Sequence, residues 1–123
     1  MKRVEAIREG FYYTDGEKII TIEGALPNRP EFFRALTEDG EEIKIRKEKL
    51  YKVRLDENWL KDFGFKEGGS VFNNTNVETT IEKFGSSYRL VEISSNDKKR
   101  MTILSVDELQ NYLFEKTGTV PSI

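Results

Sequence analysis

The chain has 123 residues, contains neither Cys nor His, and carries a formal net charge of −2 at pH 7. Its length allows one ordinary domain or two very small ones. Without Cys there is no disulfide framework and no thiolate metal site, and without His the chain lacks the commonest metal ligand and the usual general base. We therefore predict a protein that is not an enzyme and that has no catalytic residue, no cofactor and no metal site.

Hydrophobic residues make up 37% of the chain and charged residues 34%, so we expect a modest core under a well-solvated surface. No segment approaches the roughly 18 apolar residues of a transmembrane helix. The N-terminal sequence MKRVEAIREG lacks the apolar run of a secretory signal. We therefore predict a cytoplasmic protein that does not bind membranes.

The first part of the chain predicts five short β-strands. Alternating apolar residues or β-branched runs favour strands at residues 4–13, 18–22, 32–37, 41–46 and 51–55. A single helical turn at residues 47–50, before the last strand, is typical of SH3-like barrels. We therefore predict an SH3-like small β-barrel for residues 1–55.

Turn residues separate these strands. The Asp-Gly pairs at 15–16 and 39–40 supply the positive φ angles that tight hairpin turns need. Pro27 and Pro30 bracket a predicted loop, because proline lacks the N–H that a central strand must donate. Most of the strand connections are thus short, as an antiparallel barrel requires.

A short helix is predicted between the two parts of the chain. Asp56 is suited to cap its first free N–H groups, and Gly64 is suited to end it in the left-handed conformation. Three apolar residues share one side of this helix, namely Trp59, Leu60 and Phe63. Phe65 is expected to fold back onto the last turn. We favour a packing role for this helix, and the alternative is that Trp59 stacks on a ligand.

The second part, residues 56–123, predicts a β-meander after this helix. Residues 66–70 are predicted as a flexible Gly-rich loop. Strands are predicted at residues 71–73, 77–84, 88–94 and 100–104, with turns at 85–87 and 96–99. The whole chain is therefore predicted as an α+β protein, whose parts 1–55 and 56–123 are either two domains or one.

A C-terminal helix is predicted after the meander. Ser105 and Glu108 have the spacing of a capping box, in which each side chain bonds a backbone N–H of the other residue. The helix is expected to run to about Lys116, and its apolar face is formed by Val106, Leu109, Tyr112 and Leu113. Gly118 ends the helix, and the tail to Ile123 is expected to fray.

Two segments carry a resemblance, ENWLKDFGF and DELQNYLFEKTG. The matching positions are Trp59, Leu60, Phe63, Gly64, Phe65, Leu109, Gln110, Asn111, Phe114, Thr117 and Gly118. Over roughly residues 40–118 the chain resembles a group of small proteins of Bacteroides-type gut bacteria and their phages or prophages. The resemblance implies a common fold and a phage context, and it implies no activity. Members often have Pro after the barrel, where this chain has Val53 and Leu55.

The segment 43–54, IKIRKEKLYKVR, contains six basic residues and one acidic residue. Such a basic stripe is able to neutralise several phosphates of DNA or RNA, and an aromatic side chain beside it to stack on a base. The candidate nucleic-acid contacts are Lys44, Arg46, Tyr51, Lys52 and Arg54. The alternative is a solvated face, because acidic residues flank the stripe and edge-strand lysines often protect against aggregation.

These observations lead to two functional hypotheses. The first is a non-enzymatic protein-interaction module, associated with a phage or prophage, that binds an unidentified protein partner through the barrel or an edge strand. The alternative is a nucleic-acid-binding module that uses the basic stripe 43–54. Binding that weakens steeply with salt, and that needs the stripe, distinguishes the second from the first.

Overall fold

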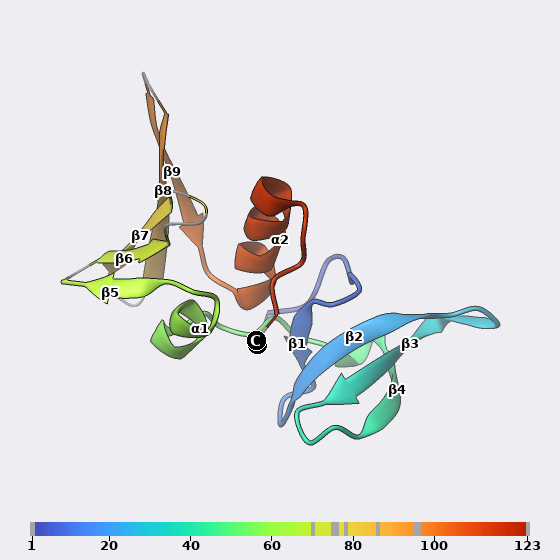
Figure 1. The fold of residues 1–123 in the computed structure, drawn as a ribbon. Helices are drawn as coiled ribbons and strands as arrows, with labels where there is room; N and C mark the ends of the chain where they lie inside the picture. Colours follow the sequence, from blue (N-terminus) through green and yellow to red (C-terminus); the bar gives the residue numbers. More distant parts are fainter. Residues whose placement is uncertain are drawn as a thin grey trace. The chain divides into compact units, whose positions relative to one another are not determined.

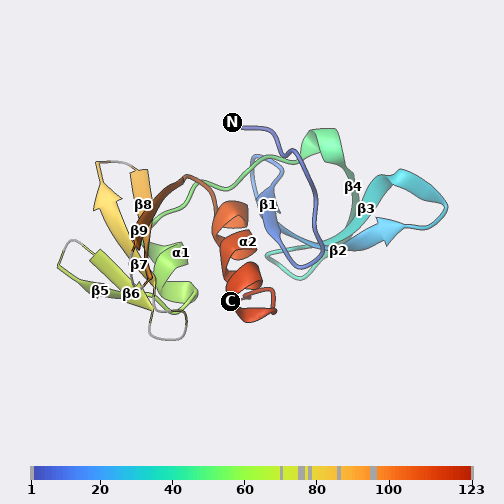
Figure 2. The ribbon, with the colours of Figure 1, turned by 90° about the horizontal axis from the view of Figure 1, so that it is seen from above.

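The structure, a computed structural model, describes residues 2–69, 71–74, 77, 79–85, 87–94 and 97–122. It is an α+β protein with two antiparallel sheets and a C-terminal helix, as predicted (Figures 1 and 2). The chain divides into two compact units, Met1–Val53 and Arg54–Pro121. This division falls two residues before the predicted boundary between residues 55 and 56. That the units are independent domains stays a prediction.

The first unit is built on a four-stranded antiparallel sheet with the order β1-β2-β3-β4 (Figure 1). Its elements are β1 (Tyr12–Thr14), β2 (Ile19–Leu26), β3 (Arg29–Thr37), β4 (Glu42–Arg46) and a 3₁₀ helix, η1 (Lys47–Lys49). The three predicted strands in the middle of this unit are therefore confirmed, although β2 and β3 are longer than predicted. The helical turn after them is confirmed as well.

The first predicted strand, residues 4–13, is wrong except at its end. Regular pairing begins only at Tyr12. Gly10 turns the chain just before it, with a φ of 83°, and its N–H donates to the carbonyl of Ile22 at 2.7 Å. The alternation of apolar residues before Gly10 therefore does not place them in the sheet.

The predicted last strand, residues 51–55, is also wrong. Tyr51 forms only isolated bridges, to Arg3 and Thr14. Within the described residues the four-stranded sheet does not close into a barrel. The predicted loop at 27–30 is a tight turn instead, because Leu26 pairs directly with Arg29.

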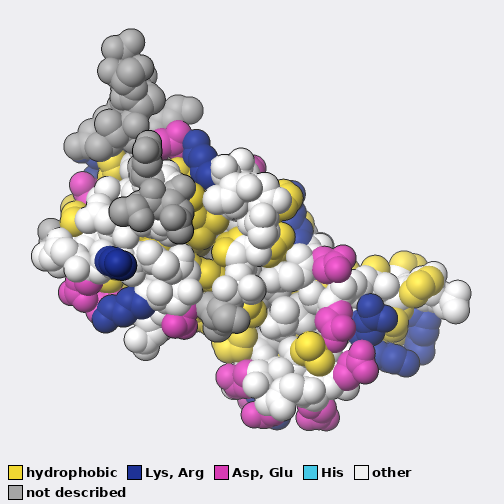
Figure 3. Space-filling model, viewed as in Figure 1, with side chains coloured by type: hydrophobic (Ala, Val, Ile, Leu, Met, Phe, Trp, Pro, Cys, Tyr) yellow, Lys and Arg dark blue, Asp and Glu magenta, His cyan; other side chains and the backbone are white. Residues whose placement is uncertain are grey.

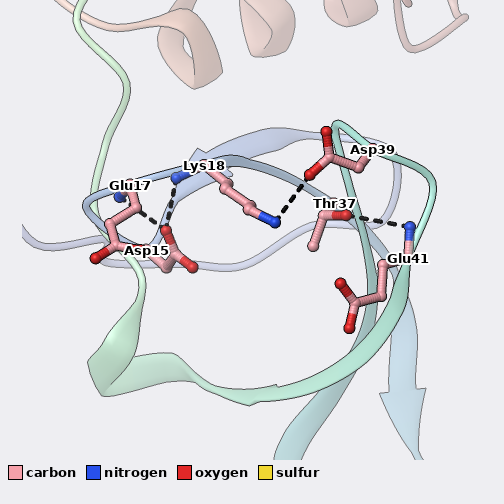
Figure 4. Close-up of polar contacts among 6 residues, drawn as sticks. All are labelled: Asp15, Glu17, Lys18, Thr37, Asp39 and Glu41. Atoms are coloured by element: carbon pink, nitrogen blue, oxygen red, sulfur yellow. Dashed lines mark hydrogen bonds and ion pairs between the residues drawn. The ribbon is translucent and has the colours of Figure 1, made fainter.

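Polar contacts hold the turns at the ends of two hairpins (Figure 4). Asp15 Oδ1 accepts hydrogen bonds from the N–H groups of Lys18 and of the residue before it, at 2.8 and 2.9 Å, and these bonds lower the pKa of Asp15. Lys18 Nζ donates to Asp39 Oδ2 at 2.8 Å, which raises the pKa of Lys18. Thr37 Oγ1 accepts from the Glu41 N–H at 3.1 Å. Both Asp-Gly turns are therefore confirmed and fixed by side chains.

One face of this sheet supplies the core of the first unit. The buried residues on it are Ile20, Ile22, Ala35, Thr37 and Ile45. Buried residues from outside the β2–β4 strands add Phe11, Tyr12, Tyr13 and Leu50. Because side chains alternate along a strand, the other face of β3 and β4 carries the side chains between these positions, and it remains open to solvent.

The second unit contains a five-stranded antiparallel sheet with the order β5-β6-β7-β8-β9 (Figure 1). Its elements are α1 (Glu57–Asp62), β5 (Lys66–Gly68), β6 (Val71–Asn74), β7 (Thr79–Phe84), β8 (Ser87–Ser94), β9 (Asp97–Ile103) and α2 (Val106–Thr117). The predicted meander is therefore confirmed. Within the predicted turns and strand ends, residues 70, 78, 86 and 96 lie outside the described residues.

The linking helix α1 starts as predicted. Asp56 Oδ1 accepts a hydrogen bond from the Trp59 N–H at 3.0 Å. Leu60 and Phe63 are buried, and Trp59 is half-buried with its ring stacked on that of Phe63 at 5.8 Å. The apolar side of the helix therefore has the packing role predicted for it.

The end of α1 is a Schellman motif. Gly64 has a φ of 90°, and its N–H donates to the carbonyl of Lys61 at 3.0 Å. The Phe65 N–H donates to the carbonyl of Leu60 at 2.9 Å. This pair of bonds satisfies two carbonyls that a helix end leaves free, and it directs the buried Phe65 back under the helix.

Two predicted connections in the second unit are wrong. Residues 66–70 are not a loop, because Lys66–Gly68 forms β5 and Glu67 pairs with Phe72. The turn is confined to the residues after Gly68, where Gly69 has a φ of 72°. Residues 97–99 of the second predicted turn belong to β9. Both hairpins are therefore tighter than predicted.

The capping box before α2 is wrong in its details. Ser105 occupies the N-cap position, but its hydroxyl makes no cap hydrogen bond and is buried without a partner among the described residues. The Glu108 carboxylate accepts instead from the Leu104 N–H at 2.8 Å, one residue earlier than predicted. At the start of α2, Glu108 therefore bonds the residue before the N-cap, and the N-cap hydroxyl of Ser105 makes no cap hydrogen bond.

The remainder of α2 follows the prediction, and the tail does not. Each of the four predicted apolar positions is buried. Gly118 ends the helix with a φ of 76° and donates its N–H to the Phe114 carbonyl at 2.8 Å. The buried Gln110 donates from Nε2 to the Pro121 carbonyl at 3.2 Å, so the tail folds back along the helix as far as Pro121.

Candidate functional site

The open edges of the two sheets are the first candidate sites. In the described part of the chain, β4, β5 and β9 each have one side that no strand pairs with. β9 has seven residues, whereas β4 has five and β5 has three. The solvent-facing side chains of β4 are all charged, a pattern that protects edges against pairing. β9 also begins with charged residues, at 97–100, but its last part, residues 101–103, is uncharged and is the stretch of open edge best suited to accept another strand.

The backbone of β9 has hydrogen-bonding groups on its open side. The Leu104 N–H points away from β8, to Glu108, and its carbonyl accepts from the Leu55 N–H at 3.2 Å. Backbone groups alternate between the two edges of an antiparallel strand. The N–H groups of Thr102 and Arg100 therefore face the open edge, while those between them bond to β8.

A hollow of about 270 Å³ lies between the end of β9 and α2. It is lined by Met101, Thr102, Ile103, Glu108, Asn111, Tyr112 and Glu115. Met101 is 46% exposed, so an apolar side chain at this edge lacks full cover. The hollow is smaller than the roughly 300–1,000 Å³ of typical small-molecule pockets, and its size suits side chains of a bound peptide.

Tyr112 ties α2 to the sheet beside this hollow. Its hydroxyl donates to Glu92 Oε2 at 3.1 Å and lies 3.0 Å from Thr79 Oγ1. Burial raises the pKa of Tyr112, so the phenol stays protonated and serves as a donor. Lys116 Nζ contacts the same Glu92 carboxylate at 2.7 Å. The wall of the hollow is thus fixed by contacts between α2, β7 and β8.

The structure places the predicted nucleic-acid contacts on different elements. Lys44 and Arg46 lie on the exposed face of β4. Tyr51 and Lys52 are half-buried and follow η1. Arg54 belongs to the second unit. Only Lys44 and Arg46 are therefore brought together on one strand face, and their role in binding stays a prediction.

The register of the β3–β4 hairpin adds residues that the sequence analysis missed. Arg34 lies opposite Lys44, and Phe32 lies opposite Arg46. Arg29 contacts the Phe32 ring, 4.5 Å from its centroid. Figure 3 shows Lys and Arg side chains gathered beside hydrophobic ones on the part of the surface formed by the β2–β3 hairpin and β4. The turn at Asp39 was the signal, because it fixes which residues of β3 and β4 share a face.

Two other kinds of feature are absent from the described residues. No group of three or more acidic side chains there is arranged to hold a metal ion. Among these same residues, no helix has the length and apolar character needed to cross a membrane.

Comparison with protein-family models, with curated proteins and with solved structures finds no match for this chain.

Proposed function

We propose that this chain is a non-enzymatic protein-interaction module that binds an extended segment of a partner protein as an added strand along β9. The observation that carries this proposal is the open seven-residue edge of β9 beside the hollow against α2. In this mode, main-chain hydrogen bonds supply affinity, and pockets for alternate side chains supply specificity.

The backbone geometry sets the register of the added strand. The N–H groups of Thr102 and Arg100 are the donors on the open edge. An incoming carbonyl placed at each of them extends the sheet without disturbing the bonds between β9 and β8. The added strand cannot extend beyond Ile103, because the carbonyl of the next residue, Leu104, already accepts a hydrogen bond from the Leu55 N–H. The partner segment therefore runs along residues 97–103.

The hollow sets the chemistry of the partner. Side chains that an added strand directs toward α2 enter a space with an apolar floor from Met101 and Ile103. Its rim carries the carboxylates of Glu108 and Glu115, of which the second belongs to an exposed residue. We expect a segment that places an apolar side chain on the floor and a Lys or Arg side chain near Glu115.

Substitution of Thr102 by Pro tests the added strand directly. Thr102→Pro removes one open-edge N–H and leaves the bonds to β8 in place, since proline is tolerated on the free side of an edge strand. We expect peptides selected from a random ten-residue display library on the wild-type protein to bind Thr102→Pro roughly tenfold more weakly, the effect of one lost hydrogen bond with a steric clash. Fluorescence anisotropy of the labelled peptides measures this change.

Thr102→Val is the matched control, because it keeps the N–H and the branched shape at the same position. We expect it to bind the selected peptides as the wild type does. Equal binding to all three proteins would contradict strand addition, as would a library that yields no peptide. Circular dichroism of Thr102→Pro checks that its fold is retained.

The finer assignments belong to the same proposal. An SH3-like barrel for the first unit is supported by the strand order β1-β2-β3-β4, by η1 after β4, and by the return of Tyr51 to Thr14. A phage or prophage context is supported by the resemblance of residues 40–118 alone. A cytoplasmic location is a further part of the proposal.

A further inference from the structure

The outer face of the β3–β4 hairpin in the first unit presents four basic side chains, three of which lie within ion-pair distance of a carboxylate. Five residues form this cationic face: Arg29, Phe32, Arg34, Lys44 and Arg46. The four basic residues are exposed and Phe32 is half-buried. A hollow of about 450 Å³, lined by Arg34, Glu42, Ile43 and Lys44, lies at its β4 edge. The face is therefore concave next to two of its cations.

The ion pairs of this face are weak enough to be exchanged. Arg34 lies 3.8 Å from Glu23, Arg46 lies 3.5 Å from Glu48, and Arg29 lies 3.5 Å from Glu31. These distances are long for charge-assisted hydrogen bonds, and the side chains of Arg34 and Arg46 are about half exposed. Lys44 has no ion-pair partner among the described residues. A phosphate oxygen is thus able to replace the carboxylate beside Arg34 or Arg46, or to bind Lys44 directly. The displaced carboxylate is not left as a buried charge.

In the other half of the face, two arginine guanidinium groups lie over one phenylalanine ring. The guanidinium groups of Arg29 and Arg46 lie 4.5 and 4.9 Å from the centroid of the Phe32 ring. Arginine planes and aromatic rings are both surfaces on which unpaired bases stack. Bases inside a duplex are already stacked on their neighbours, so this half of the face favours single strands.

We infer that the cationic face binds single-stranded nucleic acid, with phosphates at Arg34 and Lys44 and a base on the Arg29–Phe32–Arg46 stack. This inference goes beyond the proposed function, because it concerns the first unit and a different class of ligand. It also replaces the predicted stripe 43–54 by a surface that spans two strands. Side chains carry the binding here, whereas the backbone edge carries it at β9.

Fluorescence anisotropy of the full chain with labelled twelve-nucleotide single-stranded RNA, single-stranded DNA and duplex DNA tests the inference across a salt series. Arg34→Gln with Lys44→Gln removes two phosphate contacts, so we expect the slope of log K against log salt to fall by about 1.4, at roughly 0.7 for each contact. The matched control is Lys61→Gln with Lys66→Gln, which removes the same charge from exposed positions of the second unit. We expect the control to bind as the wild type does.

Two further variants separate nucleic acid from other polyanions. Phe32→Leu keeps an apolar side chain but removes the aromatic plane, and we expect at least a fivefold loss of affinity for single strands. Glu42→Gln removes an acidic group from the hollow, and we expect a twofold or larger gain. Preferential binding of single-stranded RNA or of single-stranded DNA would show which of the two is the natural ligand. Both results support the inference.

Three results would overturn it. The first is an equal loss of nucleic-acid affinity in the Arg34→Gln/Lys44→Gln variant and in the Lys61→Gln/Lys66→Gln control. The second is tighter binding of duplex than of single strands. The third is that Phe32→Leu keeps its full affinity for single strands and that dextran sulfate competes as well as an unlabelled single strand does. This result would mean that the face binds polyanions in general. The peptide test on Thr102→Pro is independent of all three, because it concerns the second unit.

Discussion

Both units of the chain are built on antiparallel sheets, but they cover these sheets in different ways. In the second unit, α1 and α2 are bonded to one sheet face, through Asn74 to the Phe63 carbonyl and through Glu92 to Tyr112. In the first unit, the described residues 2–53 contain no α-helix, and β3 and β4 leave one face exposed. In each unit one sheet face carries the core; helices contribute to that core in the second unit, whereas residues from outside β2–β4 contribute to it in the first.

The charge distribution follows the same difference. The first unit carries Arg34 and Lys44 across from each other on the bare face. The second unit places the partly exposed Met101 on the floor of a hollow that has two carboxylates at its rim. We therefore expect ligands of different chemistry at the two units, an anionic strand at the first and an extended peptide at the second.

The largest predicted effect tests whether the two units unfold separately. Ile20 and Leu90 are fully buried in the first and second sheets, and replacing either with Ala is expected to cost about 2–5 kcal/mol of unfolding free energy. Trp59, the only Trp of the chain, lies in α1 and reports on the second unit. We expect Leu90→Ala to lower the urea midpoint of Trp fluorescence, and Ile20→Ala to leave it unchanged.

Circular dichroism in the near ultraviolet supplies the complementary signal for Ile20→Ala. Tyr12 and Tyr13 are buried in the first unit, and Tyr88 and Tyr112 are buried in the second. We therefore expect the tyrosine signal to be lost in two steps, of which the step from the first unit moves to lower urea in this variant. If both substitutions shift both signals equally, the two units unfold as one cooperative domain. That result would contradict separate unfolding of the two units.

An intermediate effect is predicted at the end of α1. Gly64 has a φ of 90°, and an added Cβ meets only Asn74 Nδ2, at an ordinary 3.5 Å. The cost of Gly64→Ala is therefore backbone strain alone, about 1–2 kcal/mol. Gly68→Ala is the matched control, because a Cβ there meets only Asn73 Nδ2, at an ordinary 3.8 Å, and no left-handed backbone is required. Urea unfolding followed by Trp fluorescence measures both variants, and an equal loss in the two would contradict the Schellman assignment.

The smallest predicted effect is a pH dependence in the first unit. Backbone N–H bonds from Lys18 and its neighbour lower the pKa of Asp15 below its ordinary value of 3.8. The folded state thus binds the Asp15 proton more weakly than the unfolded state does. The stabilisation is present above pH 3.8 and is lost as the pH falls through the lower folded-state pKa.

Asp15→Asn keeps an acceptor oxygen and removes the titration. We expect this variant to be slightly less stable than the wild type at pH 7 and equally stable at pH 2.5. Thermal unfolding followed by tyrosine circular dichroism at both pH values makes the comparison. Glu17→Gln removes a charge from the same turn and controls for net charge. A stability difference that is constant with pH would contradict the role of Asp15.

Local signals in the sequence predicted the elements that depend on neighbouring residues. Asp56 and Gly64 mark the two ends of α1, because a cap and a left-handed glycine act over a few residues. The Asp-Gly turn at 39–40 brings β3 and β4 together for the same reason. In β4, Ile43 and Ile45 alternate with Lys44 and Arg46 as the predicted strand 41–46 implies, and the two isoleucines are on the less exposed face.

The errors came from contacts between distant residues. Gly10 leaves the apolar residues before it outside the sheet by bonding Ile22, which no local pattern shows. Residues 66–70 look like a flexible loop, yet Phe72 pairs with Glu67 and makes them a strand. The cationic face likewise depends on the register across a hairpin, so the sequence pattern alone led to a stripe along one segment.

The most direct test of the account is a map of backbone amide shifts by NMR. The full chain is titrated separately with a display-selected peptide and with twelve-nucleotide single-stranded RNA. We expect the peptide to shift the amides of Arg100 and Thr102, and RNA to shift those of β3 and β4. Shifts from both ligands at the same strands, or RNA shifts confined to the second unit, would contradict the assignment of an edge to one unit and a face to the other.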